Sequence, residues 1–154
     1  MSNMLLIRVI TMIDIRDHKI YFTGKESSYW MQVNVHRHLE QLYYGPRIPL
    51  QEVDVLENKN RVQFGSQVNI HEGYSLNTQL LEFSSAGKGD FRPVSIELES
   101  DDDSFVSDLR VSDVYINEKI DFPSEYFSPR INENTQQCVI ELTDDYFPVL
   151  IKLF

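Results

Sequence analysis

Apolar and polar residues alternate along most of this chain, and this period of two constrains the fold more than any other feature. Successive side chains of a β-strand point to opposite faces, so alternation is typical of strands with one buried face. The pattern is clearest over residues 51–71 and 93–99, and turn-forming residues such as Gly65-Ser66 interrupt it at hairpin spacing. We therefore predict a mainly β protein with an antiparallel sheet, folded as a sandwich or an open barrel.

The phase of the alternation changes once, after residue 111. Leu109 and Val111 occupy odd positions, whereas Val114 and Ile116 occupy even ones. A β-bulge absorbs such a change, because one extra residue returns the following side chains to the same face. We predict a bulge near Ser112-Asp113, after a hairpin formed by residues 93–99 and 105–111.

Residues 27–44 fit two interpretations. Met31, Val35, Leu39 and Leu42 recur at helical spacing, with Gly45-Pro46 as a stop signal. The first part of the same segment also alternates as a strand does. A helix at about 27–44 would make the protein α+β, and the sequence leaves both possibilities open.

The length of 154 residues predicts a single domain, residues 1–154, large enough to bury a core. Apolar runs at residues 5–15 and 149–154 predict strands buried on both faces near each end. No run approaches the roughly 20 apolar residues of a membrane-spanning helix. The single cysteine, Cys138, cannot form an intramolecular disulfide, which favours a buried structural role and a cytoplasmic location.

The net charge of −10 is concentrated in the last part of the chain. Residues 1–96 contain ten acidic and ten basic side chains, whereas residues 97–154 contain fourteen acidic and four basic ones. Nucleic acids and anionic membranes require clustered Lys and Arg, so neither is expected as a partner. A basic protein is the expected partner.

Motifs for catalysis or cofactor binding are weak in this sequence. His36, His38 and Glu40 would share one face of a strand and could hold a transition metal, but we favour the simpler interpretation of a polar, solvent-facing stretch. The glycine-rich segment 84–90 lacks the spacing of a phosphate-binding loop and predicts a turn. We predict no catalytic residue, no metal and no cofactor.

The acidic third of the chain supplies the predicted binding residues. On paired strands, like charges that share an outward face destabilise the free protein, but they complement a cationic partner. The predicted partner-binding residues are Glu97, Glu99, Asp101, Asp102, Asp103, Asp108, Asp113, Tyr115, Glu118 and Asp121.

In its general character, small, acidic, β-rich and free of motifs, the chain resembles the bacterial immunity proteins of contact-dependent inhibition. The resemblance implies a cytoplasmic, non-enzymatic protein that neutralises a basic, nuclease-like toxin by occluding its active site. The alternative is a small-ligand-binding β-barrel or an enzyme, with a pocket lined by aromatic residues. That pocket would use Trp30, Tyr43, Tyr44, His36 and His38.

Overall fold

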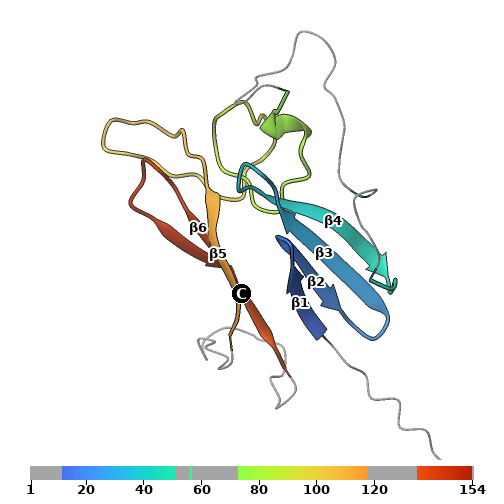
Figure 1. The fold of residues 1–154 in the computed structure, drawn as a ribbon. Helices are drawn as coiled ribbons and strands as arrows, with labels where there is room; N and C mark the ends of the chain where they lie inside the picture. Colours follow the sequence, from blue (N-terminus) through green and yellow to red (C-terminus); the bar gives the residue numbers. More distant parts are fainter. Residues whose placement is uncertain (1–11, 51–55, 57–72, 118–134, 154) are drawn as a thin grey trace, which may run out of the picture.

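The computed structural model of the chain describes residues 12–50, 56, 73–117 and 135–153. These residues form two antiparallel β-sheets and one short 3-10 helix, η2 (Leu76–Thr78). Figure 1 shows the two sheets, with the long connection between them carrying η2. The predicted mainly β fold is confirmed.

The first sheet is a meander of four strands in the order β1-β2-β3-β4. Its strands are β1 (Met12–Arg16), β2 (Lys19–Thr23), β3 (Ser27–Val33) and β4 (Leu39–Pro46). Asp17 and His18 join β1 to β2 with φ of 48° and 65°, so both lie in the left-handed region. Two-residue turns of this kind match the twist of the flanking strands, which explains the tight hairpin.

The segment at 27–44 is the β3–β4 hairpin, so the helical interpretation is wrong. The register shifts between Trp30 and Met31, and both side chains are buried, but in different clusters. Val35, which completed the helical spacing, is 92% exposed in the turn. The apparent helical period is therefore produced by a bulge and a turn within a hairpin.

The second sheet consists of β5 (Arg110–Asn117), β6 (Gln137–Thr143) and β7 (Leu150–Leu153), in that order. The register shifts between Val111 and Asp113, which confirms the predicted bulge. The predicted hairpin of residues 93–99 and 105–111 is wrong: β5 pairs with β6, and Ile96 forms an isolated parallel bridge with Ser85. Residues 93–99 alternate in exposure without pairing as a strand of this sheet.

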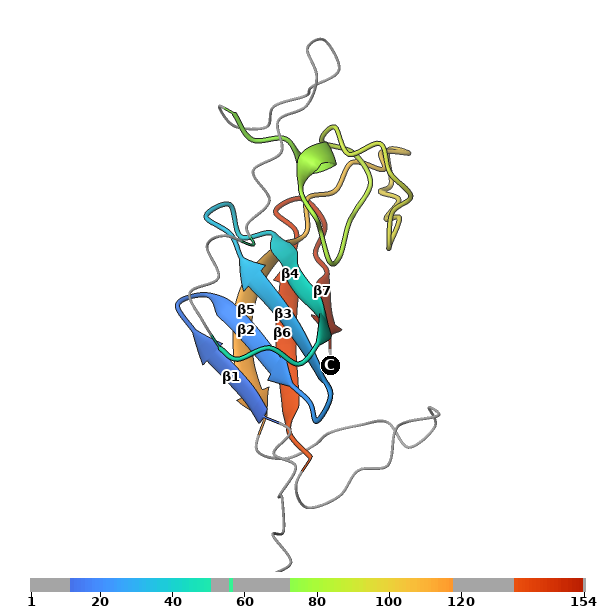
Figure 2. The ribbon, with the colours of Figure 1, turned by 90° about the vertical axis from the view of Figure 1, so that its right-hand side faces the viewer.

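The two sheets face each other across a shared apolar core, as in an open sandwich (Figure 2). The buried residues of this core come from both sheets: Ile13, Ile20, Met31, Leu39, Leu109, Val111, Cys138, Ile140 and Leu142. A smaller cluster of Tyr21, Trp30 and Leu42 packs with Ile48. The first sheet thus buries residues in two separate apolar clusters.

The strands predicted near the two ends of the chain are only partly confirmed. β1 covers the described part of the predicted N-terminal strand, whereas residues 1–11 and most of the predicted 51–71 meander lie outside the described residues. β7 alternates between exposed and half-buried positions, so its predicted burial on both faces is wrong; it pairs only with β6 among the described strands. Cys138 is buried on β6, as predicted.

Candidate functional site

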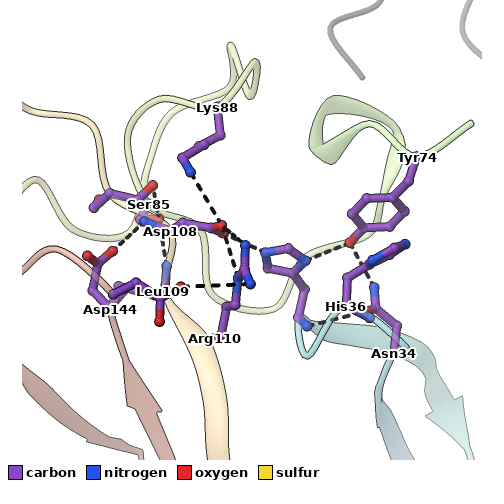
Figure 3. A network of polar contacts seen from close by, with 12 residues as sticks. Asn34, His36, Tyr74, Ser85, Lys88, Asp108, Leu109, Arg110 and Asp144 are labelled. Carbon is purple, nitrogen blue, oxygen red and sulfur yellow. Dashed lines mark hydrogen bonds and ion pairs between the residues drawn. The ribbon is translucent and has the colours of Figure 1, made fainter. Parts of the chain in front are cut away.

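The turn between β3 and β4 brings a group of polar side chains against the start of β5 (Figure 3). The Asn34 side-chain oxygen accepts the backbone N–H groups of His36 and His38, at 2.9 and 3.1 Å, and fixes the turn. The Val111 N–H donates to the Arg37 carbonyl at 2.8 Å, which ties the turn to the second sheet. The site is therefore built at a junction of the two sheets.

His38 is buried at the centre of this group. Its Nε2 lies 2.8 Å from an Asp108 carboxylate oxygen, and its Nδ1 lies 2.8 Å from the Tyr74 hydroxyl. The same hydroxyl accepts an Asn34 amide hydrogen at 2.8 Å. These contacts are all satisfied when Tyr74 donates to Nδ1 and His38 donates from Nε2 to Asp108.

Asp108 joins this histidine to two cationic side chains. Arg110 donates to its second carboxylate oxygen from Nε and Nη2, at 3.0 and 2.5 Å, and the Lys88 Nζ lies 3.8 Å from that oxygen. Burial alone would raise the pKa of Asp108, but the hydrogen bonds from His38 and Arg110 outweigh it and hold the pKa well below its ordinary value. Asp108 is thus a buried, ionised carboxylate with several partners.

A second arm of the network runs through Glu40. Gln32 and Asn34 donate their amide hydrogens to its two carboxylate oxygens at 2.8 and 2.7 Å. The side chains of His38 and Glu40, two members of the candidate metal cluster, therefore have separate hydrogen-bond partners. Within residues 12–50, 56, 73–117 and 135–153, no three His, Cys, Asp or Glu side chains are grouped to hold a metal.

An open cleft of about 710 Å³ adjoins the network at Lys88. Its other walls come from residues in the 99–106 segment and from Tyr146, Phe147 and Pro148. The Lys88 ammonium also lies 5.4 Å from the centre of the Tyr146 ring, within the range of a cation–π contact. Lys88 is the residue that the network and the cleft share.

The backbone around Lys88 explains why glycines surround it. Gly87, Lys88 and Gly89 have φ of 100°, 53° and 84°, and the Asp90 N–H closes the turn on the Gly87 carbonyl at 3.1 Å. A Cβ at Gly87 would lie 2.9 Å from a methyl carbon of Val106. The predicted turn at 84–90 is confirmed, but its lysine is part of a site that the sequence analysis did not assign.

The predicted partner-binding residues do not form one set. Glu97, Glu99 and the turn residues Asp101–Asp103 are exposed, and Glu99, Asp101 and Asp102 line the cleft. Asp108 was expected on the surface but is 4% exposed, because His38, Lys88 and Arg110 surround its carboxylate.

The remaining members of the set lie on or beyond β5. Asp113 is exposed, whereas Tyr115 is half-buried and donates to Glu141 at 3.1 Å. Glu118 and Asp121 lie outside the described residues. A partner-binding role for these acidic residues stays a prediction.

The alternative aromatic pocket is not assembled by the described residues. Trp30 is 1% exposed within its own apolar cluster, and Tyr44 is 72% exposed on β4. None of the five residues predicted for the pocket lines the cleft. The sequence analysis missed Tyr74, Lys88, Arg110 and Tyr146; the only local signal was the lysine between two glycines.

A two-sheet β-sandwich with a polar junction is the class of domain that these observations define. Residues 37–154 match the family described as "Glycosyl hydrolase family 36 N-terminal domain". The match covers more than half of the chain. The chain belongs to this family. No protein with a curated description matches the chain.

Solved structures of α-galactosidases share the fold. The galactosidase domain of the alpha-galactosidase-sucrose kinase AgaSK has a TM-score of 0.75 at 21% identity, over 87% of this chain and 19% of that one. The α-galactosidase from Lactobacillus brevis gives 0.71 at 20% identity, over 87% and 19% of the two chains. AgaB from Geobacillus stearothermophilus gives 0.76 at 18% identity, over 92% and 20%. The chain thus spans about a fifth of the length of these enzymes.

The family match corrects several expectations. The chain is not an immunity protein or a toxin inhibitor, and a basic cognate toxin is not its partner. Composition and charge misled the sequence analysis, because both are properties that unrelated small β-domains share. Within the described residues, no helix is long and apolar enough to cross a membrane.

Proposed function

We propose that this chain is a non-catalytic β-sandwich domain of an enzyme that hydrolyses α-galactosides. The observation that carries the proposal is the match of residues 37–154 to the N-terminal domain of glycosyl hydrolase family 36. Solved structures with the same fold are α-galactosidases about five times as long as this chain. The catalytic groups would then come from the remainder of such an enzyme.

The chemistry of the described carboxylates supports a non-catalytic role. Most glycosidases place two carboxyl groups across the scissile bond, one as acid and one as base or nucleophile. Here Asp108, Glu40 and Asp90 are all buried and hydrogen-bonded to fixed partners within the domain. A carboxylate bound in this way is not free to transfer a proton to a substrate.

The shared core supports treating residues 1–154 as one domain, since both sheets contribute to the same cluster. The His38–Asp108 contact joins the two sheets at the edge of that core. We propose that this junction makes the sandwich a rigid support for the rest of the enzyme. The cytoplasmic location predicted from Cys138 is part of the same proposal and is supported by its free, buried thiol.

The test is to purify the native protein from the source organism with an antibody against this chain. Hydrolysis of p-nitrophenyl α-galactoside should co-purify with it, in the same polypeptide or in a tightly bound one. The matched control substrate is p-nitrophenyl α-glucoside, which should be hydrolysed much more slowly.

The recombinant 154-residue chain provides the second arm of the experiment. It should show no hydrolysis of either substrate, because its buried carboxylates are hydrogen-bonded to partners within the domain. Hydrolysis by the chain alone would overturn the non-catalytic role. Absence of α-galactosidase activity from the native purification would overturn the enzyme assignment.

A further inference from the structure

We propose that the open cleft between Lys88 and Tyr146 binds a neutral oligosaccharide. The sugar class follows from the geometry below. The further statement that the sugar carries an α-galactosyl group rests on the proposed function, and the experiment tests the two separately.

The size and openness of the cleft suit an oligosaccharide. Its volume of about 710 Å³ lies within the range of small-molecule sites, roughly 300 to 1,000 Å³. It is bounded by Lys88, by residues in the 99–106 segment and by residues 146–148, and it is partly open to solvent. A partly open cleft of this volume admits sugar rings whose outer hydroxyl groups stay in contact with water.

Tyr146 provides an exposed aromatic surface in this cleft. Its side chain is 76% exposed, although a large aromatic ring gains by burial. The backbone N–H groups of Tyr146 and Phe147 donate to one Asp144 oxygen at 2.7 and 2.9 Å, and the other oxygen accepts the Asp108 N–H at 2.5 Å. The ring is therefore carried on a fixed turn, which reduces the ordering cost when a ligand covers it.

The polar groups of the cleft include both donors and acceptors. Lys88 donates, and Glu99 and Asp101 offer carboxylates that have no hydrogen bond or ion pair to the described residues. Asp102 accepts from the Ser100 hydroxyl and from the Ser104 N–H, so it shapes the turn. Sugar hydroxyl groups both donate and accept hydrogen bonds, and the apolar face of a sugar ring can cover Tyr146.

Two other ligand classes fit less well. A metal ion would need a cluster of ligands, and the described part of the chain has no group of three suitable side chains. A basic peptide would complement the carboxylates but would meet the Lys88 ammonium, which lies over the Tyr146 ring. A neutral ligand with hydroxyl groups uses the aromatic ring, the cation and the carboxylates together.

The experiment titrates the full 154-residue chain with raffinose and follows the amide signals by ¹H–¹⁵N NMR. Saturable shifts should appear around Lys88 and Tyr146. Tyr146→Ala should weaken binding by about tenfold, the loss expected when a stacking ring is removed. The matched control is Tyr44→Ala, since Tyr44 on β4 is almost as exposed as Tyr146 and does not line the cleft.

Two results would overturn the sugar site, and a third would overturn only its α-galactosyl specificity. The sugar site is ruled out if raffinose gives no saturable shifts. It is also ruled out if Tyr146→Ala binds raffinose as well as wild type does while its thermal melt shows a folded chain. Equal binding of maltotriose would remove the α-galactosyl specificity and leave a general sugar site. Because the titration measures no hydrolysis, its failure leaves the proposed enzyme function to be decided by the purification experiment.

Discussion

Two acidic segments of this molecule lie close together in the sequence and have opposite environments. Asp101, Asp102 and Asp103 form an exposed turn, where Asp102 stabilises the local backbone through Ser100 and Ser104. Asp108, five residues beyond that turn, is buried between the sheets with His38 and Arg110. Proximity in the sequence therefore says little about what a carboxylate does in the fold.

The difference arises from partners that are distant in the chain. His38 and Asp108 are 70 residues apart in sequence and lie 2.8 Å apart in the structure. An isolated buried carboxylate would be strongly unfavourable, so Asp108 can be buried only because these partners meet it. The turn at 101–103 meets no cation of this kind among the described residues and remains in solvent.

The largest effect is expected from Asp108→Ala. This change leaves Arg110 and His38 without their carboxylate partner in a buried site, which should lower the free energy of unfolding by about 3 to 5 kcal/mol. Urea unfolding followed by circular dichroism measures it. Asp101→Ala is the matched control and should change stability by less than about 0.5 kcal/mol. Similar losses in both variants would contradict the comparison.

The next effect is on the acid dependence of stability. The pKa of Asp108 is lower in the folded chain than in the unfolded one, so protonation favours unfolding. The stabilisation by ionised Asp108 is fully present above about pH 3.9, the ordinary carboxyl pKa of the unfolded chain. It is lost as the pH falls from there toward the lower pKa of the folded chain. Unfolding curves from pH 6 to pH 2.5 should therefore fall less steeply for Asp108→Asn than for wild type. Parallel curves would show that another group is responsible.

A smaller loss is expected from Tyr74→Phe, which removes a single hydroxyl from the buried network. His38 Nδ1 and the Asn34 amide both lose a partner, so stability should fall by about 1 to 2 kcal/mol. Tyr146→Phe removes the same hydroxyl from an exposed ring and should have almost no effect on stability. Thermal melts of both variants measure the difference, and equal melting temperatures would contradict a network role for Tyr74.

The sequence predicted those features of the fold that depend on residues close together in the chain. The alternation gave the β class, and the change of phase after Val111 located the bulge between Val111 and Asp113. The same reasoning failed at residues 93–99, whose exposure alternates although they pair with no strand of the second sheet. Alternation reports which side chains face inward, and it does not report which strands pair.

The candidate site could not be predicted in the same way. Its parts come from the β3–β4 turn, the segment near Tyr74, the glycine turn at Lys88 and the start of β5. No spacing rule links segments that far apart, and Asp108 looked like one member of an acidic surface. The family was also out of reach, because general composition pointed to a different class of small acidic proteins.

The smallest effect is expected within the exposed turn itself, from Asp102→Ala. Its carboxylate accepts the Ser100 hydroxyl and the Ser104 N–H, but both contacts are at the surface, so stability should fall by no more than about 1 kcal/mol. The free energy of raffinose binding should fall by more than the free energy of unfolding, because the turn forms one wall of the cleft. Asp101→Ala, in contrast, removes a cleft acceptor without loosening the turn. Hydrogen exchange of the Ser104 amide distinguishes the two variants, because it should become faster only in Asp102→Ala. Equal exchange rates in the two variants would show that Asp102 does not hold the turn.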